Sequence, residues 1–456
     1  MNVDEASAFP PLEIPIILRR LLTVLTCLLG LALLTSCNSG NGVGATPNLT
    51  RIRVINLVPN APSIQVSLDD NAPFVSGLQF EQSTQYVTIS AGGTPTVHEF
   101  KVSADGGQTN ILDFSAALGV AVDYTFVVYG PVEAVNQTLV IDTNTTIPNG
   151  GNYLLRAINV AAGIVAVDVY ITQPGADLGL TAPGITNVSF GQTTIFLPQD
   201  TGNSELRITR AGSKEVIYDA IITPVPDKTL AQVVIYGKGS AKLVNAAVLN
   251  IDSTGTGQVV DSNIAEFKVL NGTSLSAPLN VFVDGVLVLA NIPFAGVSNY
   301  QKVGIGPQTV TVQSATNPGA NLLTVMLNLD SATDTSVAIS GPPGALRSLV
   351  LSDNNLPSAA LRARVRFVNA SPDLSAMDVY VNFGKLFGDI ASNAASPYSE
   401  LPADPTGTSY EFDFNVAGTT TPVLKLPGVT LLTGKTYTVY VVGSVGALQG
   451  VVSQDD

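Results

Sequence analysis

The feature that most constrains the fold of this chain is a motif that occurs four times, at intervals of roughly one hundred residues. Each copy is an apolar run that ends in asparagine, at Asn56, Asn159, Asn271 and Asn369. Nine positions later stands a polar residue, followed at once by a second apolar run; these polar residues are Gln65, Asp168, Asn280 and Asp378. A fixed interval between two apolar runs is typical of two strands joined by a tight connection. The chain is therefore expected to contain four similar units in tandem.

The ends of the units repeat as well. Later in each unit an apolar run leads into glycine, at Gly130, Gly237, Gly341 and Gly443, and a last short run leads to an aspartate, at Asp142, Asp252, Asp353 and Asp455. About seven short strands fit within one unit, and β-branched residues and tyrosine dominate the runs. This pattern predicts an all-β protein built of antiparallel two-sheet β-sandwich domains. A partly closed barrel stays open as the alternative, because strand order cannot be derived from spacing.

Segments rich in Asn, Asp, Gly, Thr and Pro separate the units and indicate linkers. They place domain boundaries near residues 148, 260 and 359. The expected organisation is a signal peptide with its lipobox at 1–36, a tether at 37–49, and β-sandwich repeats 1 to 4 at 50–147, 148–259, 260–358 and 359–456.

The amino-terminal segment has the pattern of a secretion signal. Arg19 and Arg20 precede the apolar run 21–34, which supplies the charged and the apolar regions of such a signal. The run ends in Leu-Thr-Ser-Cys37, which resembles the bacterial lipobox, whose cysteine thiol forms a thioether to diacylglycerol before cleavage in front of it. We therefore expect lipidation of Cys37, with fatty acyl chains such as palmitate. The alternative is an uncleaved anchor, although the 14 residues of the run are short for a membrane span.

The charge and the positions of the cysteines limit the expected cellular location and the expected binding partners. The net charge of −14 argues against nucleic acid, because phosphate backbones attract a surplus of lysine and arginine. Cys27 would be removed with the signal, so the mature chain would hold one cysteine and no internal disulfide. Asn38 after the lipidated cysteine favours the outer membrane in a Gram-negative host, on its periplasmic or its surface face. The expected location is the bacterial cell envelope, with the membrane contacted through the lipid anchor.

Two segments of the last unit resemble the bacterial family known as domain of unknown function 4397. They are Arg364 to Gly384, which contains Asn-Ala-Ser-Pro-Asp and Asp-Val-Tyr-Val, and Tyr437 to Gly443. The resemblance is strong in repeat 4, fair in repeat 1 and weak in repeats 2 and 3, where other residues replace Ala-Ser-Pro-Asp. It implies immunoglobulin-like sandwiches in an exported or surface-anchored protein, and it implies no established activity.

The sequence offers little for catalysis. A nucleophilic site needs a base beside the nucleophile, and the one histidine, His98, lies in an expected strand, where a surface or cross-strand position is favoured. No catalytic residue, cofactor or metal ligand is assigned, and the protein is expected not to be an enzyme. Calcium at the repeat junctions, held by Asp142, Asp252 and Asp353, is the alternative to a role of these aspartates at strand ends and turns.

Two further sets of polar residues recur. The four asparagines are expected to hydrogen-bond the backbone of the following connection, rather than line a ligand site. The alternating arginines are expected to pair with acids on a solvated sheet face, or alternatively to contact an acidic glycan or lipid headgroups; they are Arg51, Arg53, Arg362, Arg364 and Arg366.

Repetition favours a non-catalytic structural spacer or interaction module over an enzyme, since a protein that gains from reach or multivalent contact gains from copies. The alternative is a surface lipoprotein that binds an envelope glycan or protein. An envelope enzyme is the third possibility, and it would require clustered unpaired carboxylates in one repeat.

Overall fold

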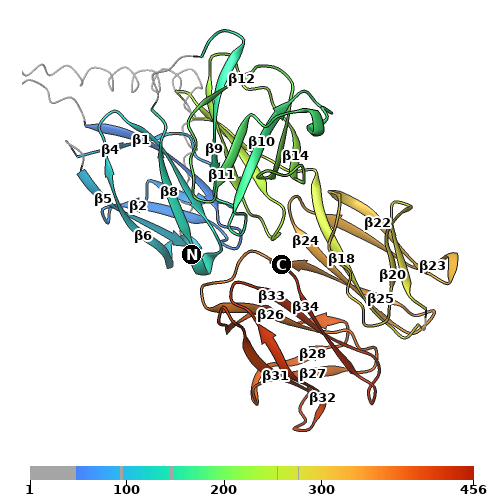
Figure 1. Cartoon of the computed structure of the whole chain (residues 1–456). Helices are drawn as coiled ribbons and strands as arrows, with labels where there is room; N and C mark the ends of the chain where they lie inside the picture. Colours follow the sequence, from blue (N-terminus) through green and yellow to red (C-terminus); the bar gives the residue numbers. More distant parts are fainter. Residues whose placement is uncertain (1–47, 93–95, 144–147, 254, 276) are drawn as a thin grey trace, which may run out of the picture. The chain divides into compact units, whose positions relative to one another are not determined.

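The structure is a computed structural model, which describes residues 48–92, 96–143, 148–253, 255–275 and 277–456. Within these residues the secondary structure consists of strands and three short 3₁₀ turns (Figure 1). The expected all-β sandwich architecture is thereby confirmed.

The strands fall into four sets, one for each repeat. Repeat 1 contains β1 (Leu49–Leu57), β2 (Ile64–Leu68), β3 (Val75–Leu78), β4 (Val87–Ser90), β5 (Thr96–Ala104), β6 (Thr109–Leu118), β7 (Asp123–Tyr129) and β8 (Asn136–Ile141), with η1 (Asp105–Gly107) and η2 (Val132–Ala134). Repeat 2 contains β9 (Asn152–Asn159), β10 (Ala166–Thr172), η3 (Leu178–Leu180), β11 (Ile185–Ser189), β12 (Leu197–Asp200), β13 (Ser204–Arg210), β14 (Val216–Ile222), β15 (Leu230–Tyr236), β16 (Asn245–Ile251) and β17 (Gly257–Val260).

Repeats 3 and 4 follow the same plan. Repeat 3 contains β18 (Ile264–Thr273), β19 (Leu279–Val283), β20 (Val286–Ile292), β21 (Gln301–Gly304), β22 (Gly306–Ser314), β23 (Asn317–Leu329), β24 (Asp334–Gly341) and β25 (Arg347–Asp353). Repeat 4 contains β26 (Arg362–Asn369), β27 (Ala376–Val381), β28 (Gly384–Ala391), β29 (Ala394–Ala395), β30 (Ser399–Pro402), β31 (Thr408–Val416), β32 (Pro422–Leu431), β33 (Thr436–Val442) and β34 (Gln449–Gln454).

Each repeat folds into two sheets with one strand order. In repeat 1 the sheets are β4-β1-β7-β8 and β3-β2-β5-β6, and the other repeats follow the same order, with β17 added in repeat 2 and β29 and β30 sharing one edge in repeat 4. The described strands pair antiparallel apart from one parallel pair in each repeat: β1–β7, β9–β15, β18–β24 and β26–β33. The first two strands lie in different sheets, whereas in antibody domains they share one. The spacing of the strands along the sequence did not determine this strand order.

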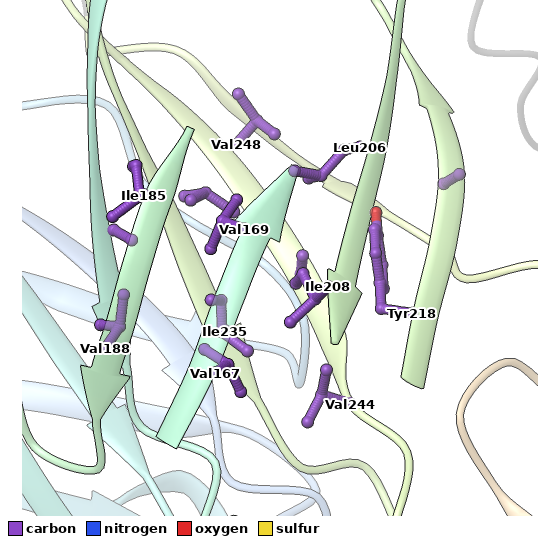
Figure 2. Close-up of a cluster of buried hydrophobic side chains, with 14 of the residues drawn as sticks. Val167, Val169, Ile185, Val188, Leu206, Ile208, Tyr218, Ile235, Val244 and Val248 are labelled. Atoms are coloured by element: carbon purple, nitrogen blue, oxygen red, sulfur yellow. The ribbon is translucent and has the colours of Figure 1, made fainter. Parts of the chain in front are cut away.

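The core of each repeat lies between its two sheets. In repeat 2, Val167 and Val169 on β10 point toward Ile208 on β13 and Ile235 on β15 (Figure 2), and all four are fully buried. Burial of one such side chain stabilises a fold by about 1.5–3 kcal/mol. The strand alternation seen in the sequence therefore selects the inner face of each sheet.

The other face of the first-strand sheet is also buried, in contact with a neighbouring repeat. Ile55 and Val127 of repeat 1 join Ile158 and Val234 of repeat 2 in one apolar cluster. A second cluster joins repeats 3 and 4 in the same way, through residues that include Leu270, Ala338, Val368, Ala370 and Tyr440. Since Asn48–Asp456 forms one compact unit, the repeats are packed together rather than strung on flexible linkers.

Candidate functional site

The four repeated asparagines are structural. All four side chains are completely buried. The amide nitrogen of Asn369 donates to the carbonyl oxygens of Leu374 (2.9 Å) and Ile390 (3.1 Å), and its amide oxygen accepts from the backbone N–H of Ser371 (3.3 Å). Asn56, Asn159 and Asn271 make the same two kinds of bond. The expectation that the amide satisfies the backbone of the following connection is confirmed.

The polar residues nine positions later have a related role. The Asp168 carboxylate accepts from the backbone N–H groups of Asn187 (2.7 Å) and Gly212 (2.8 Å). Asp378 does the same with Asp389 and Gly418, both at 3.0 Å. Each carboxylate thereby bonds the backbone of one adjacent strand, β11 or β28, and the backbone of the turn that follows the other adjacent strand, β13 or β31.

The arginine rows do not lie on a solvated face, so that expectation is wrong for most of their members. Arg53 is 0% exposed and Arg366 only 3% exposed, because the sheet face of Arg53 packs on repeat 2 and that of Arg366 packs on repeat 3. A basic residue stands three positions before every repeated asparagine: Arg53, Arg156, Lys268 and Arg366. This fixed offset is the sequence signal that could have identified Arg156 and Lys268 as members of the same set.

The first junction, which we define as the buried polar cluster between repeats 1 and 2, centres on the Asp142 carboxylate. It accepts from Nη2 of Arg156 at 2.5 Å, and Nη2 of Arg53 lies 3.4 Å away. The hydroxyls of Thr125 and Tyr86 also donate to it, each at 2.5 Å. Both guanidinium groups thus share a single carboxylate that is itself 0% exposed.

A glutamine completes the first junction. Gln232 accepts from Nε and Nη2 of Arg156 (2.9 and 2.7 Å) and donates to the Thr125 hydroxyl (2.7 Å). On the other side, Nη1 of Arg53 donates to the carbonyl oxygens of Asn250 (2.7 Å) and Gly255 (3.2 Å), which flank Asp252 of repeat 2. The basic residue of each repeat therefore donates hydrogen bonds to groups near the carboxyl-terminal end of the other repeat.

The second junction, the corresponding cluster between repeats 3 and 4, is built the same way. Lys268 of repeat 3 pairs with Asp455 of repeat 4, and Arg366 of repeat 4 pairs with Asp353 of repeat 3. The Thr438 hydroxyl donates to Asp455 at 2.5 Å. The exchange is reciprocal, as in the contact between two subunits related by a two-fold axis.

Two groups of the junctions, Tyr86 and Arg366, are held in their protonated forms. Burial, together with the charge of Asp142, raises the pKa of Tyr86 well above its usual value, so this phenol stays protonated. Burial works against the charged form of Arg366, yet the adjacent Asp353 carboxylate raises the net pKa of the guanidinium. These groups are suited to hold structure rather than to exchange protons at neutral pH.

The aspartates considered for calcium are occupied by protein donors. Asp142 and Asp353 bind guanidinium groups, and Oδ1 of Asp252 accepts from the backbone N–H of Gly255 at 2.7 Å. In the part of the chain that the structure describes, no group of three or more His, Cys, Asp and Glu side chains could hold a metal ion.

His98 is buried rather than on the surface, at 6% exposed, and its Nδ1 lies 2.6 Å from Oδ2 of Asp69. This hydrogen bond lowers the pKa of the Asp69 carboxyl. No nucleophile contacts the imidazole among the described residues, where its Nε2 is buried without a partner. The pair joins β5 to the turn after β2.

Two pairs of neighbouring carboxylates were missed by the sequence reasoning. In repeat 2, burial and then a hydrogen bond with Glu205 raise the pKa of Asp219 to about 6. In repeat 3, Glu266 and Asp334 lie directly opposite each other on paired strands. Strand pairing creates both, between the consecutive strands β13 and β14 in repeat 2 and between the distant strands β18 and β24 in repeat 3, so neither is marked by a local sequence motif.

A polar hollow of about 430 Å³ opens beside the second junction. It is lined by Lys242, Lys268, Tyr300 and Asp455, together with residues 297–299 and 451–454 and Asp456. Lys268 and Asp455 face it while they are paired with each other.

The predicted lipidation residue, Cys37, lies outside the described residues, as do the signal peptide (1–36) and nearly all of the tether (37–49). Among the residues that the structure describes, no helix has the length and apolar character needed to cross a membrane.

The fold and the junctions define a tandem β-sandwich protein whose repeats are fused in pairs. The family model "Domain of unknown function (DUF4397)" matches residues 50–170, 265–376 and 363–456. The chain belongs to this family, as its motifs indicated.

Other comparisons add little. No curated protein matches the chain. Among solved structures, the chain is similar to the product complex of a multi-modular glycogen-degrading pneumococcal virulence factor, at 12% identity and a TM-score of 0.17. The match covers 83% of this chain and 38% of that one, so the chain spans well under half of its length. A TM-score this low supports no argument about function.

Proposed function

We propose that this protein is a lipid-anchored component of the bacterial cell envelope that acts as a non-catalytic structural spacer or interaction module. The observation that carries the proposal is the use of charge at the two junctions. The basic residues Arg53, Arg156, Lys268 and Arg366 are all buried and hydrogen-bonded between repeats. Recurring side chains that an enzyme would present to substrate are used here to hold repeats together.

The anchor rests on the sequence around Cys37. Intact mass and membrane fractionation of the protein made in its bacterial host test it, with wild type compared to Cys37→Ala. We expect wild type to begin at an acylated Cys37 and to fractionate with the outer membrane, and the variant to lose both properties. A soluble wild type that keeps residues 1–36 would contradict the anchor and leave the description of the four repeats untouched.

The second candidate function is binding of an envelope glycan or protein, and the polar hollow beside the second junction favours it. A glycan array probed with residues 38–456 separates the two functions. A pure spacer should retain no glycan, whereas a binding module should retain one class, and the substitution Lys242→Ala in the hollow should weaken that retention. Retention that Lys242→Ala leaves unchanged would move the binding site elsewhere.

A further inference from the structure

One position in the fold carries opposite charges in repeat 1 and like charges in repeat 3. The residue five positions before the repeated asparagine lies opposite a residue of the parallel partner strand in every repeat. The pairs are Arg51 with Asp123, Leu154 with Leu230, Glu266 with Asp334, and Arg364 with Thr436. Like charges directly opposite each other on a sheet are destabilising. Repeat 3 therefore places two acids where the fold accepts an ion pair or two leucines.

Neither acid of this pair is exposed to solvent, and among the described residues neither forms a salt bridge. Glu266 is 3% exposed and Asp334 is 1% exposed. Within the described residues, Oε2 of Glu266 and Oδ1 of Asp334 have no hydrogen-bond partner. An ionised carboxylate that is buried and unpaired is costly, and two neighbouring carboxylates avoid the cost when they hold a proton.

The cations near the pair offset part of this cost for Glu266, and Lys302 lies directly opposite it on β21, but burial outweighs them and the pKa of Glu266 stays raised. Asp353, at the end of β25, adds a further negative charge near Asp334. Lys242, Lys302, Arg210 and Glu215 surround Glu266. Lys302 is itself paired with Glu215 at 3.1 Å, and Lys242 is exposed to solvent.

The pair lies where three parts of the chain meet. Oδ2 of Asp334 accepts from the Nδ2 of Asn355 at 2.8 Å. Asn355 belongs to the connector between repeats 3 and 4, and its backbone N–H donates to the carbonyl oxygen of Gly239 in repeat 2 at 2.7 Å. The next residue, Leu356, is 3% exposed. The charge state of Asp334 therefore bears directly on how the connector is held.

We propose that Glu266 and Asp334 form a pH-sensitive latch. When the pair holds a proton, Asp334 stays buried against the connector. When both carboxylates ionise, the cost of the buried charge favours release of the connector, although the hydrogen bond from Asn355 by itself favours the ionised form. Burial, together with the charge of Glu266, raises the pKa of Asp334 to about 7, and burial also raises the pKa of Glu266. Since the folded-state pKa of Asp334 exceeds the ordinary value of 3.8, the closed state binds the proton more tightly. Closure is thus favoured at low pH and weakens as the pH rises through about 7.

Amide hydrogen exchange of the connector in the full chain tests the latch at about pH 5 and about pH 8.5, after correction for the intrinsic pH dependence of exchange. Protection of the Asn355 and Leu356 amides should fall with rising pH, by up to roughly tenfold for each pH unit inside the window, which is the slope for one proton. The amide of Val160, hydrogen-bonded to Ile235, serves as the internal reference and should not change. Equal connector protection at both pH values in wild type would overturn the proposal.

Variants assign the effect to the pair. Asp334→Asn should abolish the pH dependence at the connector, and Glu266→Gln should reduce it, because burial is the larger cause of the raised pKa of Asp334 and the charge of Glu266 adds to it. Asp123→Asn, which alters the same register position in repeat 1, should leave it intact. If these amide variants do not fold, Glu266→Leu copies the leucine that repeat 2 carries at this position. A connector that remains pH-dependent in folded Asp334→Asn, or a pH dependence that Glu266→Gln leaves unchanged, would assign the effect to other groups and overturn the proposal.

Discussion

The carboxylate of Asp142 and the guanidinium of Arg156 meet at 2.5 Å across the first junction, with 0% and 6% of their side-chain surfaces exposed. Removal of one partner from a buried ion pair leaves an uncompensated charge and typically costs about 3–5 kcal/mol. Asp142→Ala should cost at least this much in the free energy of unfolding, because it strands Arg53 as well. Urea denaturation measures the difference. Asp123→Ala is the control, because its Arg51 partner is 34% exposed and such a pair contributes about 0–1 kcal/mol. Equal losses for the two variants would contradict the structural role of the junction.

The repeated asparagines lead to a second prediction. Asn369→Ala removes the donor that satisfies the buried carbonyl groups of Leu374 and Ile390. Each buried group left unpaired costs about 1–3 kcal/mol, so for the two carbonyl groups we expect a loss of about 2–6 kcal/mol in the free energy of unfolding. Asn136→Ala, whose side chain makes an exposed bond to the carbonyl of Ala134, should change stability by less than about 0.5 kcal/mol. A neutral Asn369→Ala would show that the repeated amide is not required by the fold.

Gly443, which follows β33, has a φ of 85°, and a Cβ built there would lie 2.7 Å from the carbonyl oxygen of Ala447. Gly443→Ala therefore combines backbone strain with a backbone clash, and it should lower the free energy of unfolding by about 2–4 kcal/mol. Gly446→Ala is the matched control: its φ is 95°, but nothing lies within 4 Å of the added carbon. Thermal unfolding of the two variants should separate the clash from the strain, with a clearly lower Tm for Gly443→Ala.

The carboxylate pair of repeat 2 predicts a pH dependence of stability. Burial and then Glu205 raise the pKa of Asp219 to about 6, above its ordinary value of 3.8. The folded state then binds more protons than the unfolded state between these values, so this contribution to stability falls as the pH rises from 3.8 through about 6.

Thermal unfolding at about pH 4.5 and about pH 7.5 measures this effect. The Tm of Asp219→Asn minus the Tm of wild type should be larger at about pH 7.5 than at about pH 4.5. Glu205→Gln should shrink the pH dependence too, because it removes the neighbouring charge. A constant difference in Tm between Asp219→Asn and wild type at both pH values would refute the assignment.

Several features of the fold were predictable from the sequence because they depend on neighbours along the chain. Alternation in β26 places Ala363, Val365 and Phe367 on one face, and all three are fully buried in the core of repeat 4. One bond of the repeated asparagine is likewise local, since in all four repeats its amide oxygen accepts from the backbone N–H two residues later. The sandwich class and the role of these asparagines followed from such short-range patterns.

The destination of the charged residues was decided by the tertiary structure. Alternation puts Arg364 and Arg366 on the face opposite the core, but it does not say what covers that face. Arg366 is buried because repeat 3 supplies Asp353, and Lys268 is buried because Asp455 lies opposite, although 187 residues separate the two in sequence. The same holds for Glu266 and Asp334, which become neighbours only when β18 and β24 pair in parallel. A one-dimensional pattern determines which side chains share a face; the packing of distant strands determines whether that face meets water, an opposite charge or a like one.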